Sequence, residues 1–287
     1  MKYVFIRTQE RLHRVTRLCT VLGVSRSGYY AWRDRPVSAR TADDQRLLPL
    51  LRQIHQEMRE EYGAIKLWRE ASGRGLRCGR HRVARLRILG GLEAKRVRRF
   101  RVSVEHHQLP PPAPNVLQQR FETTGLNRVW VGDFTMVATR AGWLYVAVLL
   151  DLYSRRVIGW AMRNKPDQQL TLDALAMAVR QRQIQPGLIH HSDQGAQYSA
   201  RLYQQRLRDL GLTPSMSRKG NCYDNAVAES FFSTLKNELI HHQTYQTHGE
   251  AGREIFAFIE GFYNRQRLHQ SLGYLSPLEF ERRLGES

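Results

Sequence analysis

The 287-residue sequence contains only three cysteines, Cys19, Cys78 and Cys222, which are far apart along the chain. So few and so scattered thiols argue against a disulfide framework and against a Cys-x-x-Cys zinc site. Long apolar stretches are also lacking, because the longest run, Trp143 to Leu150, has eight residues, whereas a helix that spans a bilayer needs about 20. Met1-Lys2-Tyr3 does not lead into the apolar stretch of a secretory signal. We therefore expect a soluble, cytoplasmic protein with no membrane partner.

Acidic residues are scarce relative to basic ones: 26 Asp and Glu stand against 45 Lys and Arg, which gives a net charge of +19. The imbalance lies in the first 120 residues, which hold 26 of the basic residues and 10 of the acidic ones. Such a distribution is typical of a protein that binds a polyanion, because neutralised phosphates release condensed counterions. A basic surface that only aids solubility is the alternative, and charge alone does not distinguish the two.

The first part of the basic half, residues 1–40, has the pattern of a helix-turn-helix segment. Apolar residues recur at helical spacing from Arg11 to Leu22, and Gly23 ends that helix. Ser25 is a candidate N-cap for a second short helix that runs through Tyr29 and Trp32. Helix, glycine turn and helix together indicate a helix-turn-helix, although two packed core helices would give the same pattern.

A second basic helical unit is predicted over residues 41–104. Asp43 or Asp44 is expected to cap a helix that ends near Met58, and two more helices follow, after Tyr62-Gly63 and over 79–89. We interpret this unit as a helix-turn-helix-like DNA-binding domain. The alternative is a helical bundle with a solvated basic face. Its candidate DNA-contact residues are Arg80, Arg82, Arg85, Lys95, Arg96, Arg98 and Arg99.

Prolines mark the boundary to the second half, because residues 110–114 hold four prolines in five positions. Such a stretch favours an extended linker, which we place at residues 105–124. Beyond it, the apolar pattern predicts an α/β core with a mixed sheet over residues 125–240 and a helical segment over 241–287. The expected strands cover 129–138, 143–150, 156–162 and 188–190, and the expected helices cover 168–183, 200–210 and 225–241.

Three carboxylates are notable for where they lie in this core. Asp133 is inside the first apolar strand, and Asp193 directly follows the fourth. A charge in a buried strand is unfavourable unless something compensates it, and ligands of α/β sheets bind at the carboxyl ends of strands. Glu229 lies on the last predicted helix of the core, where Lys236 falls within about 40° of it on the same edge.

Three carboxylates brought together repel one another unless a cation neutralises them, and hard oxygen ligands suit Mg²⁺ or Mn²⁺. Two such ions about 4 Å apart could activate a water and stabilise the leaving oxygen of a phosphodiester. The alternatives are a locally hydrogen-bonded Asp133, a capping Asp193 and a surface Glu229. A further acid, Asp151, is expected to order the turn that follows its strand instead of joining the site.

Five segments of the second half resemble the transposases of the insertion sequence three family. They are VWVGDFT (129–135), HSDQG (191–195), SRKGNCYDNA (217–226), ESFFSTLK (229–236) and YNRQRLHQSL (263–272). Between Asp193 and Glu229 lie 35 residues, which is the spacing of the DDE transposase and retroviral integrase superfamily. The likeness is close over 126–280 and looser over 44–101, where HRVARL (81–86) resembles the family's helix-turn-helix segment.

The resemblance implies a ribonuclease H-like mixed-sheet catalytic core preceded by all-α helix-turn-helix-like DNA-binding units. It implies Asp133, Asp193 and Glu229 as the catalytic triad that binds Mg²⁺ or Mn²⁺, with two ions per active site. Lys236 would contact DNA near the scissile phosphate, and Arg218 and Lys219 are further DNA-contact candidates.

The function that follows from the resemblance is that of a bacterial DNA transposase. It would nick the ends of an insertion element and join the freed 3′-hydroxyl to another phosphodiester. The expected partners are double-stranded DNA, both the terminal inverted repeats and the target, and further copies of the chain in a dimer or larger assembly. In this family the reading frame is usually joined by frameshifting to an upstream one, so a fusion partner is also expected.

Two other functions are compatible with the same residues. One is a stand-alone Mg²⁺-dependent nuclease, which would cut DNA without joining strands. The other is a DNA-binding regulator that keeps the fold and has no catalytic activity, in which Asp133→Asn would change nothing.

Overall fold

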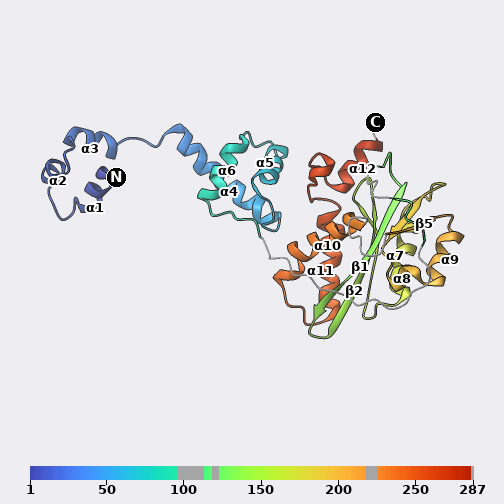
Figure 1. Cartoon of the computed structure of the whole chain (residues 1–287). Helices are drawn as coiled ribbons and strands as arrows, with labels where there is room; N and C mark the ends of the chain where they lie inside the picture. Colours follow the sequence, from blue (N-terminus) through green and yellow to red (C-terminus); the bar gives the residue numbers. More distant parts are fainter. Residues whose placement is uncertain (96–112, 118–122, 218–224, 286–287) are drawn as a thin grey trace.

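The computed structural model describes residues 1–95, 113–117, 123–217 and 225–285. Figure 1 shows the N-terminal helices, a second helical unit set apart from them, and a larger body that contains the sheet. None of the helices within these ranges is long and apolar enough to cross a membrane. The predicted linker falls partly outside the described residues, and its residues 113–117 form neither helix nor strand.

The N-terminal unit consists of α1 (Lys2–Gln9), α2 (Val15–Leu22) and α3 (Arg26–Arg33). The predicted cap of α3 is confirmed, because the Ser25 hydroxyl accepts a hydrogen bond from the Gly28 N–H at 3.0 Å. The predicted end of α2 is also confirmed, since Gly23 has a φ of 61°, a left-handed conformation that glycine adopts without strain. Helix α1 was not expected from the sequence pattern.

The second unit contains α4 (Ala39–Glu57), α5 (Ala64–Gly73) and α6 (Arg80–Leu89). The prediction that Asp43 or Asp44 caps α4 is wrong. The cap is Ser38, whose hydroxyl accepts a hydrogen bond from the Thr41 N–H at 3.1 Å. Asp44 instead pairs with α6, where it accepts a hydrogen bond from Arg82 Nε at 2.7 Å and another from Arg85.

The larger body is built on a five-stranded mixed sheet with the strand order β3-β2-β1-β4-β5. Strands β1, β2 and β3 pair antiparallel, whereas β4 pairs parallel with β1 and β5 pairs parallel with β4. The strands cover β1 Val129–Thr139, β2 Gly142–Asp151, β3 Val157–Arg163, β4 Ile189–Ser192 and β5 Thr213–Met216. The four predicted strands are therefore confirmed within about two residues, and β5 is additional.

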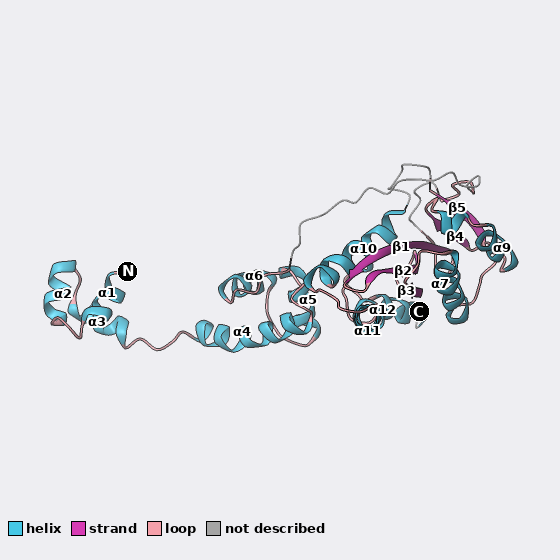
Figure 2. Ribbon diagram, turned by 90° about the horizontal axis from the view of Figure 1, so that it is seen from below, coloured by secondary structure: helices cyan, strands magenta, loops and turns pink. Residues whose placement is uncertain are grey.

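Helices cover both faces of this sheet, as Figure 2 shows. The residues of β1 alternate between two cores: Val129, Val131 and Val137 belong to the core that includes α10, and Trp130 belongs to the core that includes α7. This alternation is what a strand buried on both faces requires. The helices of the body are α7 (Gln168–Gln181), α8 (Ala196–Ser199), α9 (Arg201–Asp209), α10 (Ala226–Glu238), α11 (His248–Phe256) and α12 (Pro277–Gly285).

The C-terminal segment closes the α10 face of the body. A π-helical turn, Ala257–Tyr263, extends α11, and short 3₁₀ turns lie at Ile240–His242 and Gln270–Leu272. Just after the π-helical turn, the side-chain amide of Asn264 bonds both the N–H and the C=O of Val157 on β3, each at 3.0 Å. The C-terminal segment is thus tied to the sheet by hydrogen bonds from the Asn264 side chain to the main chain of β3.

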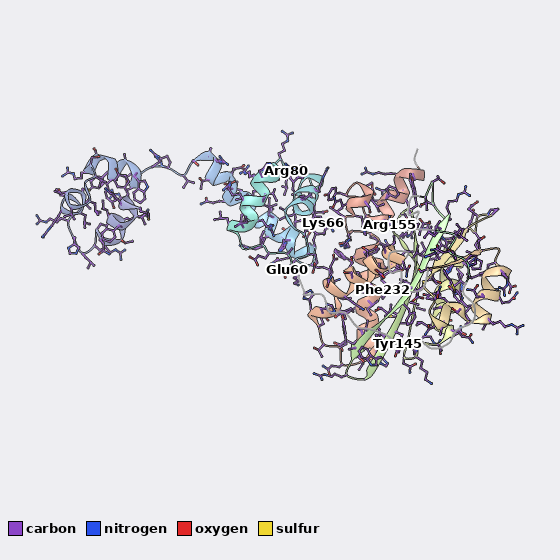
Figure 3. The ribbon with its side chains drawn as sticks, viewed as in Figure 1. Glu60, Lys66, Arg80, Tyr145, Arg155 and Phe232 are labelled. Carbon is purple, nitrogen blue, oxygen red and sulfur yellow. The ribbon has the colours of Figure 1, made fainter. Side chains whose placement is uncertain are left out.

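The second helical unit packs on this C-terminal segment. The Tyr62 hydroxyl accepts a hydrogen bond from the Leu268 N–H at 3.0 Å and donates one to the Gln266 carbonyl at 3.3 Å. Beside it, Arg267 forms a two-pronged ion pair with Glu238 of α10, with Nε–Oε2 and NH2–Oε1 distances of 2.8 and 2.6 Å. Lys66 is labelled in Figure 3 on the side of the unit that faces the body.

Glu61 is a buried acid in this interface. Its side chain is 7% exposed, and among the described residues its Oε1 has no hydrogen-bond partner. Burial, followed by repulsion from Glu238, raises the pKa of Glu61 to about 7, although Lys95 and Arg267 act in the opposite direction. The ionised form is therefore unfavourable in the folded protein at neutral pH.

We predict that Glu61→Gln stabilises the protein at high pH. Because the folded-state pKa lies above the ordinary value of 4.5, the wild type loses stability as the pH rises from about 4.5 through about 7, and the neutral amide does not. The gain should be on the order of 2–3 kcal/mol at pH 8 and below about 1 kcal/mol at pH 5. Thermal melts of both proteins at several pH values measure it.

Glu60→Gln is the matched control, since Glu60 is a neighbour whose side chain is 45% exposed and pairs with Lys95 at 3.1 Å. It should change the melting temperature little at any pH. A Glu61→Gln effect of equal size at pH 5 and pH 8 would contradict the prediction.

Candidate active site

Asp133 and Asp193 lie side by side because of the register between β1 and β4. These strands pair parallel, with Gly132 opposite Ser192, so each aspartate is the next residue after the last matched pair. Residues matched in a parallel pair point to the same face, and neighbouring strands are about 4.8 Å apart. Val131 belongs to the α10 core, and Asp133, two positions on, points to that face too. The structure therefore brings the two carboxylates together on the α10 side.

Backbone N–H groups orient both carboxylates. Asp133 Oδ1 accepts a hydrogen bond from the Phe134 N–H at 2.8 Å, and Asp193 Oδ1 accepts one from the Gly195 N–H at 2.9 Å. A side chain at Gly195 would displace the Asp193 carboxylate, because a Cβ atom there would lie 2.9 Å from Asp193 Oδ1. The glycine of the HSDQG segment thus leaves room for this orientation of the aspartate.

Helix α10 brings Glu229 and Lys236 to the same place. Its buried residues, Ala228, Phe231, Phe232 and Leu235, pack on the body, and Phe232 is labelled on this helix in Figure 3. Because those residues face inward, Glu229 and Lys236 lie on an outer edge of α10, where Glu229 is exposed and Lys236 is half-buried. The predicted shared edge of the acid and the lysine is consistent with this arrangement.

The pKa of Asp133 reflects the charges of the three other side chains, Asp193, Glu229 and Lys236. Burial raises the pKa of Asp133 well above its usual range, and the negative charges of Asp193 and Glu229 raise it further. The Phe134 N–H and the positive charge of Lys236 act against that rise. Burial lowers the pKa of Lys236, while Asp133 raises it. Desolvation also raises the pKa of Glu229, although that residue as a whole is exposed.

This arrangement fits a divalent cation. Asp133 and Asp193 offer hard carboxylate oxygens, and repulsion from Asp193 adds to burial in raising the pKa of Asp133. As the side chains stand in the described part of the chain, no three His, Cys, Asp or Glu groups are close enough to hold one ion together. The two aspartates thus lie on adjacent strands, and Glu229 lies within electrostatic reach of Asp133 but farther away.

Tyr198 is a residue of this region that sequence reasoning missed. It is fully buried, and its ring centroid lies 6.4 Å from that of Phe134, next to Asp133. Its hydroxyl has no hydrogen-bond partner within the described ranges. Burial raises the pKa of Tyr198 well above its usual value, and both aspartates add to that rise. No spacing rule singles out one tyrosine, so only the fold reveals this neighbour.

Asp151 has the structural role expected of it. It is fully buried, and its Oδ1 accepts hydrogen bonds from the N–H groups of Tyr153 and Ser154, at 2.9 and 3.0 Å. Its Oδ2 accepts one from the Asn127 N–H at 2.7 Å. Asp151 therefore orders the turn after β2 and does not join Asp133.

The predicted DNA-contact residues differ in their surroundings. Arg80 is exposed on α6 and is labelled in Figure 3 on the outer side of the helical unit. Arg82 and Arg85 pair with Asp44, and Lys95 pairs with Glu60 at 3.1 Å. These ion pairs would compete with phosphate contacts. Arg96, Arg98, Arg99, Arg218 and Lys219 lie outside the described residues.

Comparisons with known proteins match both the second helical unit and the body that contains the sheet. Models of the integrase core domain match residues 124–222 and 210–277, and a model of the HTH-like domain matches 42–100. The chain is 46% identical to the insertion element IS600 uncharacterized 31 kDa protein of Shigella sonnei, over 92% of this chain and 97% of that protein. It is 40% identical to the transposase InsF for insertion sequence IS3A of Escherichia coli K12, over 98% of each chain.

The chain belongs to the IS3 family of insertion-sequence transposases. It carries a DDE-type polynucleotidyl transferase core, of the integrase type that depends on divalent metal. Among solved structures, the catalytic core domain of BIV integrase covers 56% of the transposase at 18% identity, with a TM-score of 0.42. The HTLV-2 integrase catalytic core domain in complex with magnesium covers 54% at 15% identity, with a TM-score of 0.40.

We predict that the transposase is stabilised by Mg²⁺ through Asp133. At about ten times its Kd, the ion should stabilise the folded state by about 1.4 kcal/mol, which corresponds to a rise in melting temperature of about 3–5 °C. Asp133→Asn should melt higher than the metal-free wild type, because it removes a carboxyl whose charged form is disfavoured by burial and by Asp193, and should respond little to Mg²⁺. Thermal melts with and without the ion measure both effects.

Asp209→Asn is the control for this comparison, since Asp209 is an exposed acid on α9. It should keep the full response to Mg²⁺. An equal response from wild type and Asp133→Asn would show that the ion binds elsewhere.

Proposed function

We propose that Asp133, Asp193 and Glu229 are the metal-binding catalytic triad of the transposase, and that Lys236 contacts DNA beside them. The observation that supports this most directly is the meeting of Asp133 and Asp193 at adjacent strands, with Glu229 and Lys236 of α10 near them. The proposed cofactor is Mg²⁺ or Mn²⁺, with two ions per active site. Glu229 would complete the ligand set by a change of rotamer, for which the exposed edge of α10 leaves room.

The residues of the chain would set the geometry of the reaction. Bound metal supplies activation of a nucleophilic hydroxyl and stabilisation of the departing phosphodiester oxygen. Asp133 and Asp193, held by the N–H groups of Phe134 and Gly195, would keep the ligand oxygens in place. Lys236 would bind the phosphate next to the scissile bond, since its half-buried ammonium already lies near the aspartates.

The proposed reaction has two steps on DNA. Water first cuts a phosphodiester at an end of the element and leaves a free 3′-hydroxyl. That hydroxyl then attacks a second phosphodiester, so one bond forms as another breaks and no covalent link to the protein is needed. The helical unit matched by the HTH-like model would hold the duplex, with Arg80 and the other basic residues named above as phosphate-contact candidates.

The proposed partners follow from the reaction. Double-stranded DNA serves both as terminal inverted repeat and as target. Joining two element ends requires more than one active site, so the working form would be a dimer or larger assembly. A fusion with the product of an upstream reading frame is a further expectation, and the proposed site of action is the bacterial cytoplasm, where chromosomal and plasmid DNA lie.

The test is a strand-transfer assay with purified chain, Mg²⁺ and a labelled duplex that carries the element's terminal inverted repeat. Wild type should produce nicked ends and joined strands. Asp193→Asn and Glu229→Gln should each lower both products by about 10⁴-fold, as happens when one member of a catalytic unit is removed. Asp209→Asn, which removes an exposed acid from α9, should retain activity.

The other outcomes identify the alternatives. Nicks without joined strands would indicate a stand-alone nuclease. Bound DNA without products from any variant, in the presence of the upstream-frame product, would indicate a regulator. Equal products from wild type and Glu229→Gln would remove Glu229 from the triad.

A second prediction concerns Lys236. Lys236→Ala should weaken binding of the terminal-repeat duplex and lower the slope of log K against log salt by about one, since one phosphate contact is lost. Lys165→Ala is the matched control, because Lys165 is exposed in the loop before α7. Fluorescence anisotropy at several salt concentrations measures the slope. A slope equal to that of wild type would refute the contact.

A further inference from the structure

The three N-terminal helices lie outside the matched HTH-like segment, which begins at residue 42. Helices α2 and α3 are joined by three residues, Gly23, Val24 and Ser25. The Val24 N–H bonds the Cys19 carbonyl at 3.0 Å, and the left-handed Gly23 turns the chain at the end of α2. A short turn with glycine between two helices is the geometry of a helix-turn-helix.

This unit has its own core. Ile6 of α1, Cys19 of α2 and Tyr29 of α3 are buried against one another, and no residue beyond Trp32 takes part in that cluster. Lys2 of α1 also bonds the Leu22 carbonyl at the end of α2, at 2.8 Å. Figures 1 and 2 both show the three helices apart from the second helical unit. The orientation of α3 is thus set within the unit itself.

The outer face of α3 is polar and accessible. Tyr29 and Trp32 face the core, and Arg26, Ser27 and Ala31 on the other side are exposed. Arg26 and Ser27 are the first two residues of the helix. In helix-turn-helix proteins the N-terminal residues of the second helix are the ones that contact base edges.

The charge of the unit is almost uncompensated. Its two acids are both engaged: Glu10 accepts a hydrogen bond from the Tyr29 hydroxyl, and Asp34 pairs with Arg33 at 2.9 Å. Five arginines are exposed, and no ion pair to them occurs within the described ranges; they are Arg7, Arg11, Arg14, Arg17 and Arg26. A surface of this kind is complementary to the phosphates of a duplex.

We propose that residues 1–34 form a second duplex-DNA-binding site, in which α3 enters the major groove and Arg26 and Ser27 face the bases. Arginine matches the two acceptors of guanine, and serine can bond to either partner of a base pair. Arginines of α1 and α2 would contact phosphates on either side. The choice of duplex, the ends of the element, rests on the proposed function.

The test is a hydroxyl-radical footprint of the full-length chain on duplexes from both ends of the element, with the affinity measured by anisotropy. Arg26→Ala combined with Ser27→Ala should lose one block of protection, keep the remainder, and bind about tenfold or more weakly. Both side chains are exposed, so the variant should melt like wild type. Arg206→Ala, which removes an exposed arginine from α9, is the control for loss of one charge.

The outcomes separate this proposal from the proposed function. A footprint and an affinity equal to those of wild type overturn the proposal, and retained strand transfer would leave the function intact. A uniform loss of affinity with every block of protection kept also overturns base recognition by α3. Exposed Val4, Phe5 and Leu12 offer an apolar surface that a second copy of the chain could cover. If Phe5→Ser lowers the mass in solution while Arg26→Ala combined with Ser27→Ala leaves the footprint unchanged, the partner is a protein and the proposal is overturned. If wild type protects neither end, both proposals fail.

Discussion

The parallel pairing of β1 with β4 is the constraint on which the rest of the site depends. It fixes Asp133 and Asp193 on one face at the distance of neighbouring strands, where two like charges repel. The rest of the fold must offset the free energy of that repulsion. Buried apolar residues on both faces of the sheet and the positive charge of Lys236 on α10 do so. The pairing of two carboxylates thus lowers the stability of the fold at this point, which is the cost expected of a site built for a function other than stability.

The C-terminal motif YNRQRLHQSL supports this site from a distance. Asn264 bonds the main chain of β3, and Arg267 pairs with Glu238 on the helix that carries Glu229. Tyr62 of the helical unit bonds the main chain at Gln266 and Leu268. In the described residues the motif therefore joins the sheet, α10 and the helical unit, and packing accounts for two of its polar side chains, Asn264 and Arg267.

Much of the core could be predicted from its sequence because the long strands of the antiparallel part carry strong apolar patterns. Strand β5 could not, since Thr213–Met216 has four residues, one of them Pro214, and becomes a strand only by pairing with β4. The pairing of Arg82 with Asp44 was hidden for a similar reason: it joins positions 38 residues apart, and an arginine-rich helix looks the same with or without such a partner.

The candidate site was also predictable only in part. Asp133 and Asp193 could be recognised because the apolar patterns of their strands were clear. The Tyr198 hydroxyl, which has no hydrogen-bond partner among the described residues, depends on how α8 packs against the sheet. The exposed edge position of Glu229 followed from helical geometry, but its separation from the two aspartates did not.

The bonds of Asn264 to β3 bear on how copies of the transposase can assemble. Strand β3 is an edge of the sheet, and an open edge is a template for strand pairing between molecules. Here the main-chain groups of Val157 are occupied by Asn264, and the Trp160 N–H is directed at the sulfur of Met177 at 3.3 Å. Continuous sheets across two copies are therefore disfavoured at this edge. An assembly of copies of the transposase is thus expected to use surfaces other than the β3 edge.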